Sequence, residues 1–382
     1  MTKHIYCDVV IAGCGAAGLY TALNLPKDLH VLMICKEDMD TCDSMLAQGG
    51  ICVLRGEDDY ESYFEDTMRA GHYENRKESV DLMIRTSPGI IRHLLELGVG
   101  FDKNPDGSLK YTKEGAHSRP RICFHEDITG KAITTVLQEQ TAALPNVNIM
   151  EYTVMTDILT ANGACAGILA RTGDGSTLSI HARDGSTLSI HARDTVMATG
   201  GIGGLYQHST NFPCLTGDAL TVARKHGVKL EHLDYVQIHP TSLYTEKPGR
   251  SFLISESARG EGAVLLNGKG ERFVNELLPR DAVSQAIEAE MEKEGSRHVW
   301  LSFAPMPRET IREHFPHIYE TCLEEGYDIT REPIPVVPAQ HYFMGGVWVD
   351  LDSRTTMEHL YAVGETSCNG VHGKNRLASN SL

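Results

Sequence analysis

The first residues with recognisable chemistry are three glycines near the start of the chain. Gly13, Gly15 and Gly18 stand in the run Gly-Cys-Gly-Ala-Ala-Gly, directly after the strand-like run 8–12, which is apolar after its first residue, Asp8. This spacing allows a tight turn, a close approach of a pyrophosphate and close packing of a helix on a strand, while the N-terminus of the helix attracts the anion. A helix-forming stretch and a second apolar run at 30–34 follow. We therefore predict a dinucleotide-binding βαβ unit rather than a purely structural turn.

Two observations favour FAD over NAD as the dinucleotide. An acidic residue at the end of the second strand is expected to hold a ribose, but Cys35 and Lys36 stand there, with Glu37 one place later. Glycine-rich segments at 47–51 and 363–365, the second ending in a glutamate, suit a flavin with a long ribityl chain. NAD stays as the alternative.

Several charged side chains further along the chain are ambiguous when taken singly. With 18 histidines in the chain, His239 or His341 alone is more often structural than a ligand contact. By spacing alone, a solvated loop residue is the favoured interpretation of Glu114, with a functional carboxylate as the alternative. Arg280 has a structural alternative in a salt bridge to its neighbour Asp281.

The sequence pattern also indicates the elements that must position these residues. Residues 233–341 change in character, with loops that carry Pro and His around a mixed helix and strand region. This order predicts a nucleotide-binding domain that is interrupted by an inserted cap and then resumes. The expected helices lie at 19–25 and 75–97, the second broken near Pro88, and further strands at 148–152, 155–159, 166–171, 195–198, 345–350 and 359–363.

Residues 174–183 are repeated without change at 184–193. A single copy would make one arm of a hairpin with an Asp-Gly turn. Two copies do not make a solenoid, which needs several repeats. We interpret the repeat as a tandem insertion that lengthens a surface hairpin, with a functional element as the alternative.

Composition excludes several classes of partner. The chain has 35 Lys and Arg against 51 Asp and Glu, a net charge of −16, which argues against nucleic acid and anionic membranes. We find no apolar run of about 18 residues that could span a bilayer, and no signal peptide. The ten cysteines are scattered without metal-binding spacing, so we expect reduced thiols, a cytoplasmic location and no metal.

Taken together, the motifs resemble those of the succinate dehydrogenase/fumarate reductase flavoprotein superfamily and, within it, the L-aspartate oxidase family. The matching segments run from one end of the chain to the other: 13–18, 47–51, 198–201, 216–218, 239–241, 255–262, 279–281, 341–342 with 345–346, and 372–382.

The resemblance implies a cofactor and its binding residues. Members that attach FAD covalently carry a histidine where this chain has Asp43, so non-covalent FAD is implied. The cofactor-binding residues, from the motifs and the resemblance together, are Gly13, Cys14, Gly15, Ala16, Ala17, Gly18, Lys36, Asp43, Ser44, Ala47, Gln48, Gly49, Gly50, Thr199, Gly200, Asp218, Glu365, Ser381 and Leu382.

The resemblance also implies a substrate site. His239, His341 and Arg376 match residues that hold the two carboxylates of a C4 dicarboxylate, and Ser255, which replaces a threonine, matches a further contact. Arg280 matches a proton-shuttling arginine; it is expected to stabilise developing charge and to relay a proton to Glu256 or another acid. Glu114 matches a carboxylate thought to orient a substrate ammonium. The resemblance therefore favours a functional carboxylate over a solvated loop residue at this position.

The implied function is FAD-dependent oxidation of L-aspartate to iminoaspartate, with O2 or fumarate as electron acceptor and hand-off to quinolinate synthase in NAD biosynthesis. The implied fold is α/β: a Rossmann-like FAD-binding domain at 1–232 and 342–382, with an inserted α+β capping domain at 233–341. The C-terminal helical domain usual in the family is expected to be absent. The alternatives are a soluble fumarate reductase or succinate oxidase, disfavoured by Glu114 and Asp43, and an inactive truncated FAD-binding remnant.

Overall fold

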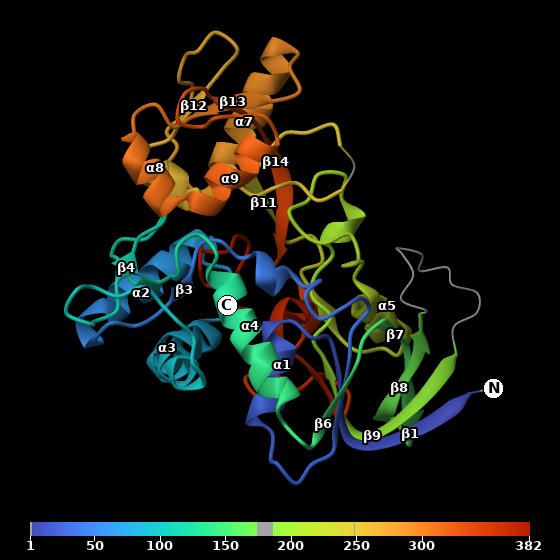
Figure 1. The fold of residues 1–382 in the computed structure, drawn as a ribbon. Coiled ribbons are helices and arrows are strands. Elements are labelled where there is room, and N and C mark those ends of the chain that lie inside the picture. Colours follow the sequence, from blue (N-terminus) through green and yellow to red (C-terminus); the bar gives the residue numbers. More distant parts are fainter. Residues whose placement is uncertain (1, 174–185, 248) are drawn as a thin grey trace.

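A seven-stranded sheet carries the glycine motif at the end of its central strand. The computed structural model describes residues 2–173, 186–247 and 249–382. The strand order is β6-β2-β1-β9-β8-β7, with β16 also beside β9. Figure 1 shows the neighbours β7, β8 and β9 side by side. Neighbours are parallel except for β7, β8 and β9, which pair antiparallel as a meander. This arrangement confirms the predicted α/β class. The strands are β1 Lys3–Ala12, β2 Val31–Ile34, β6 Val147–Met150, β7 Thr153–Ala161, β8 Ala164–Thr172, β9 Thr187–Met197 and β16 Leu360–Ala362.

Both faces of this sheet are buried, which explains why its first strands read as continuous apolar runs. Val10 and Leu32 pack into one core with α5, whereas Val9 and Met33 pack into another with helices of the opposite face. Alternate side chains of a strand point to opposite faces, so a run without polar residues requires cover on both sides. The covering helices are α1 Ala16–Asn24, α3 Lys77–Leu97 and α4 Thr129–Ala142 on one face and α5 Asp218–Lys225 on the other.

The second predicted helix is continuous, and the predicted break at Pro88 is wrong. Pro88 lies inside α3, which runs without interruption to Leu97. A proline removes the N–H that would bond to the carbonyl oxygen four residues earlier, here that of Ile84. The hydroxyl of Ser87 donates to the Ile84 carbonyl at 2.7 Å and so replaces the lost donor.

A second sheet belongs to the region predicted as a cap. Its strands run in the order β11-β14-β13-β12 and are antiparallel, and they share a core with α7, α8 and α9 at one end of the molecule (Figure 1). β11 begins at Val236 and β14 ends at Phe343, close to the predicted boundaries, and the division itself stays a prediction. The elements are β11 Val236–Leu243, α6 Glu256–Gly260, β12 Val264–Leu266, α7 Arg280–Glu294, β13 Val299–Ser302, α8 Arg308–His314, α9 Pro316–Glu324 and β14 Ile334–Phe343.

The repeated segment joins two neighbouring strands. β8 and β9 are antiparallel partners, and the end of the second copy, residues 187–193, lies in β9. The first copy and the start of the second, residues 174–185, lie outside the described residues, so the tandem insertion stays a prediction.

Short elements complete the fold. All ten cysteines are free thiols, as expected from their spacing. Within the described ranges, no helix is both long and apolar enough to cross a bilayer. The remaining elements are α2 Glu57–Ala70, the strands β3 Ile51–Cys52, β4 Tyr111–Thr112, β5 Ile122–Cys123, β10 Leu230–Glu231, β15 Gly346–Trp348 and β17 Ser367–Cys368, and the 3-10 turns η1 Asp43–Leu46, η2 Gly203–Leu205 and η3 Gly364–Thr366.

Candidate active site

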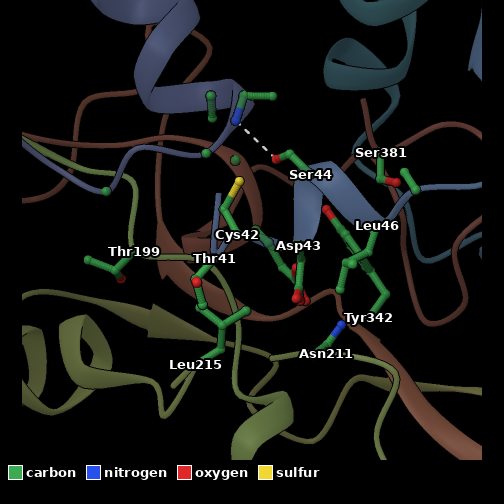
Figure 2. Close-up of a pocket in the computed structure, with 18 of the residues that line it drawn as sticks. Thr41, Cys42, Asp43, Ser44, Leu46, Thr199, Asn211, Leu215, Tyr342 and Ser381 are labelled. Atoms are coloured by element: carbon green, nitrogen blue, oxygen red, sulfur yellow. Dashed lines mark hydrogen bonds between the residues drawn. The ribbon is translucent and has the colours of Figure 1, made fainter. Parts of the chain in front are cut away.

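One cavity lies at the carboxyl ends of the parallel strands and extends to the cap. Residues that follow β1, β2, β9 and β16 line it, together with η1 and with side chains of β11, α6, α7 and β14. Figure 2 shows the wall around η1, with Asp43, Ser44 and Leu46. This edge is where ligands bind in parallel α/β sheets. The cavity is lined by all seven substrate-site residues expected from the sequence and by every expected cofactor-binding residue except Gly18.

Gly18 shapes the cavity from behind. A Cβ on Gly18 would lie 2.1 Å from the Gly13 carbonyl oxygen, so this glycine is needed where α1 packs against the loop. A Cβ on Gly13, whose φ is +122°, would lie 1.9 Å from the Ala198 carbonyl oxygen. Gly15 caps α1, and the Ala16 N–H donates to the Ser44 hydroxyl at 3.0 Å (Figure 2). The result is a tight turn that opens the N-terminus of α1 toward the cavity, as pyrophosphate binding requires.

Buried polar atoms in the wall are left for a ligand. Asp43 Oδ2 and Gln48 Oε1 are buried and have no hydrogen-bond partner among the described residues. A buried polar group without a partner is costly. Both belong to segments assigned to the cofactor, so the residues present fit a bound dinucleotide.

Two carboxyl groups in the wall have pKa values raised to near neutral pH. Burial raises the pKa of Asp43 to about 7, even though the carboxylate accepts the Phe212 N–H at 2.9 Å. Burial, and then the charge of Asp43, raises the pKa of Glu365 to about 8. Desolvation favours the neutral form of a carboxyl group, so both can carry a proton near pH 7.

The ammonium group of Lys36 forms its hydrogen bonds and its ion pair within the protein. Its Nζ donates to the Cys214 carbonyl oxygen, the Thr216 hydroxyl and the Asp218 carboxylate at 2.8–2.9 Å. Lys36 and Asp218 therefore tie the end of β2 to the start of α5 at the cavity wall, and neither is a free charge.

Arg280 pairs with the residue that the proton-relay hypothesis requires. Its Nε donates to Glu256 Oε2 at 2.5 Å, and its Nη1 donates to Gln237 Oε1 at 2.9 Å. Asp281 lies instead against His72, at 3.1 Å, so the alternative salt bridge between Arg280 and Asp281 is wrong. Burial raises the pKa of Glu256, but the charges of Arg280 and Arg259 outweigh it, and the pKa lies below its usual value.

The two histidines are neutral in the free protein. Burial, and then the charge of a nearby arginine, lowers the pKa of both His239 and His341 far below the usual value. The Ile254 carbonyl oxygen lies 3.0 Å from His239 Nε2, so Nε2 carries the proton and the buried Nδ1 is an unpartnered acceptor among the described residues. His239 must therefore take up a proton before it can donate to a carboxylate through Nδ1. His341 is fixed through Nδ1 by the Thr210 hydroxyl at 2.8 Å.

Arg376 is buried and retains donors for an anion. Its Nη1 donates to the Ser381 hydroxyl at 3.0 Å, its Nε has no partner among the described residues, and its guanidinium lies 4.8 Å from the centre of the Tyr342 ring. Burial, and then Arg280, lowers the pKa of Arg376 to about 10. Arg376 is therefore charged at neutral pH and suited to a carboxylate.

Glu114 lies beside the residues expected to bind the carboxylates. It is only 4% exposed, which rules out the solvated loop residue that spacing alone favoured. Its Oε1 accepts the Ser257 hydroxyl at 3.1 Å, and its Oε2 accepts the Ser379 hydroxyl at 2.5 Å. Ser255 caps α6, accepts the Ser257 N–H and donates to the Ser257 hydroxyl.

The sequence reasoning missed part of the cavity lining. Tyr342 and Ser379 stand inside segments that carried the resemblance, so a signal for them was present. Arg250 had no signal, because its place in the wall depends on how the loop before α6 folds. The other missed polar or backbone contributors include Thr153, Val154, Met155, Thr210 and Asn211.

Fold, cavity and family model together define an FAD-binding flavoprotein: the model for an FAD binding domain matches residues 8–382. Relatives give the narrower assignment. L-aspartate oxidase of Clostridium perfringens is 50% identical over 98% of this chain and 83% of its own length, and that of Clostridium acetobutylicum is 45% identical over 99% and 85%. The chain belongs to the L-aspartate oxidase family. A solved structure of E. coli quinol fumarate reductase is similar, at 31% identity and a TM-score of 0.90 over all of this chain and 68% of that one.

Proposed function

We propose that the protein oxidises L-aspartate to iminoaspartate with FAD as the hydride acceptor. One observation carries the proposal: a single cavity contains cationic and hydrogen-bonding side chains that suit two carboxylates, and it also contains the Glu114 carboxylate, which suits an ammonium. Arg376 and His341 would hold one carboxylate. His239, after it takes up a proton, and Ser255, after its hydroxyl turns from Ser257, would hold the other. Each of these side chains is fixed by a partner within the protein.

Binding between these groups orients the substrate and excludes water from the reacting carbon. When bound, FAD would supply the two-electron acceptor for the hydride that leaves Cα, with O2 or fumarate as the final electron acceptor. Glu114 accepts hydrogen bonds from the ammonium. Arg280 stabilises charge near the reacting carbon, and Glu256, in contact with Arg280 Nε, takes part in the proton relay.

The wall residues would hold FAD without a covalent bond. Asp43 offers no nitrogen nucleophile for attachment to a flavin, unlike the histidine that occupies its place in covalent members. The N-terminus of α1 would meet the pyrophosphate, and Gln48, Gly49 and Gly50 would face the flavin together with Glu365, Ser381 and Leu382.

The proposal also includes the domain division and the metabolic role of the product. We place the FAD-binding domain at 1–232 and 342–382 and the cap at 233–341. The imine product would pass to quinolinate synthase in cytoplasmic NAD biosynthesis. Fumarate reduction in the same cavity is the second candidate, favoured by the similarity to fumarate reductase.

Anaerobic absorbance spectroscopy tests the proposal. The purified protein is expected to be yellow, to lose its flavin absorbance on addition of L-aspartate and to keep it on addition of succinate. Bleaching by succinate and not by L-aspartate would favour the second candidate. A colourless protein that does not take up added FAD would contradict both.

A further inference from the structure

The Glu114 carboxylate is held by two hydroxyl groups from different parts of the molecule. Ser257 belongs to α6 of the cap region and donates to Oε1, whereas Ser379 follows the last strand of the chain and donates to Oε2. Each oxygen thus has one donor and keeps a further lone pair for another. Neither serine is among the residues to which a role in the reaction has been assigned above.

The surrounding backbone is built around this contact. Ser379 has a φ of +58°, an uncommon conformation for a residue other than glycine, and its hydroxyl also accepts the Gly50 N–H at 3.1 Å. A Cβ on Gly49 would lie 2.5 Å from Glu114 Oε1 and 2.9 Å from Ser379 Oγ. Strained backbone of this kind persists where the surroundings enforce it, often at functional sites.

A buried ion cluster fixes the loop that carries Glu114. Arg121, fully buried, pairs with Asp59 and Asp66 of α2 and contacts His117 Nδ1 at 3.1 Å. His117 Nε2 in turn lies 2.9 Å from the carbonyl oxygen of Ala378, the residue before Ser379. The Glu114 loop and the Ser379 segment therefore share one rigid support, whereas Ser257 approaches from the cap.

We propose that Ser257 and Ser379 are positioning residues that hold the Glu114 carboxylate ready for a substrate ammonium. This inference rests on the proposed function, in which Glu114 distinguishes L-aspartate from dicarboxylates without an amine. Hydroxyl donors stabilise the carboxylate charge and restrict the rotation of a side chain that would otherwise lose entropy on binding. Because Ser257 comes from the cap, the carboxylate has both donors only when the cap is in place.

Replacement of each serine tests the inference in the flavin-loaded protein. Two quantities are measured: the L-aspartate concentration that gives half the maximal rate of anaerobic flavin reduction, and the dissociation constant of fumarate by calorimetry. Ser379→Ala is expected to raise the first by about fivefold, the loss of one net hydrogen bond, and to leave the second unchanged. The Ser257 hydroxyl also accepts the Ser255 hydroxyl, so for Ser257→Ala we expect the first to rise by about fivefold more than the second. Ser257→Thr keeps the hydroxyl and is expected to restore the wild-type value.

A cap serine outside the cavity provides the matched control. Ser242 is buried and donates to the Val337 carbonyl oxygen at 2.7 Å, so Ser242→Ala removes a similar bond without contact to Glu114. We expect Ser242→Ala to change neither quantity. Changes of the same size in both quantities, or in the Ser242→Ala variant, would show a merely structural effect and overturn the inference.

Glu114→Gln separates the inference from the proposed function. If Glu114→Gln raises the L-aspartate value and the serine variants do not, the positioning role is wrong and the proposed function stands. If Glu114→Gln has no effect, the role of Glu114 and the inference fall together. Wild-type protein whose flavin L-aspartate does not reduce would overturn the proposed function itself and the inference with it.

Discussion

Arg280 shows what the sequence could and could not supply for a single residue. Its motif predicted a position near the reacting carbon, but the same sequence was also compatible with a salt bridge to Asp281. Only the folded chain shows that Arg280 donates to Glu256 and Gln237, whereas Asp281 contacts His72. The seven residues predicted for the substrate site were chosen because motifs carried them, and they line one cavity, whereas no motif pointed to the contact between Ser257 and Glu114.

The Arg280→Lys substitution tests the geometry of the guanidinium. Lysine keeps the charge but cannot donate to Glu256 and Gln237 from two fixed nitrogens at once. We expect the rate of flavin reduction by L-aspartate to fall by about 100-fold or more, in the range found for misplaced acid–base groups, with FAD retained. Stopped-flow absorbance measures the rate. Arg272→Lys, on an exposed arginine that pairs with Glu276, is the control and should change little; a similar loss in both variants would contradict the assignment.

Asp43→Asn tests the buried acid in the cofactor wall. Burial raises the pKa of Asp43 to about 7 in the folded protein, from an ordinary value of 3.8 for an aspartate side chain. The folded state therefore binds a proton that the unfolded state has lost, and stability falls as pH rises between these values. The stabilisation is fully present below pH 3.8 and is lost as pH rises through 7.

For the flavin-free protein, we expect the free energy of unfolding to fall by about 1.4 kcal/mol per pH unit more in wild type than in Asp43→Asn over this range. Urea unfolding at several pH values measures the difference. Parallel profiles for the two proteins would show that Asp43 is ionised in the folded state.

At the scale of elements, periodicity and glycine spacing predicted most of the fold around the cofactor. The helix and second strand of the βαβ unit, β6 to β8 and both late strands lie within a few residues of the expected positions, whereas β1 and β9 begin five and eight residues earlier than expected. The error at Pro88 has a local cause, because a proline ends a helix unless another donor reaches the freed carbonyl, and the sequence does not show where the Ser87 hydroxyl points. Loop residues such as Arg250 could not be predicted, since tertiary packing alone brings them to the wall.

Ser87→Ala tests this account of α3. The Ser87 hydroxyl donates to the Ile84 carbonyl oxygen and accepts the Leu54 N–H at 2.9 Å. Its removal takes a partner from the carbonyl of the buried Ile84 and from the N–H of the partly buried Leu54, and we expect a loss of about 1–3 kcal/mol in the free energy of unfolding. Thr86→Ala, on an exposed hydroxyl bonded to Leu82 in the same helix, should cost much less. Equal losses in urea unfolding would contradict the special role of Ser87.

At the scale of the whole molecule, the site depends on how the cap meets the rest of the chain. Asp127, just before α4, accepts the N–H groups of Ile318 at 3.0 Å and His317 at 3.4 Å, at the N-terminus of α9. A carboxylate there satisfies free N–H groups and complements the helix dipole. This contact joins the two parts of the molecule away from the cavity.

Asp127→Ala is therefore expected to weaken substrate binding without removing the cofactor. The cap would close less firmly, and the L-aspartate concentration for half-maximal flavin reduction should rise by a factor of about five, the equivalent of ~1 kcal/mol for one cap. Asp106→Ala, on a carboxylate bonded to Ser108 in an exposed turn, is the control. Loss of FAD from Asp127→Ala, or an equal effect of Asp106→Ala, would show that Asp127 does not act through the cap.

In the proposed function, one cavity holds both carboxylates of a C4 dicarboxylate beside the flavin. A crystal structure of the FAD-loaded protein with fumarate measures this directly. We expect one carboxylate against Arg376 and His341, the other against His239 and Ser255, and Arg280 beside the central carbons. Fumarate bound away from these residues, or their side chains turned out of the cavity in that complex, would contradict the account.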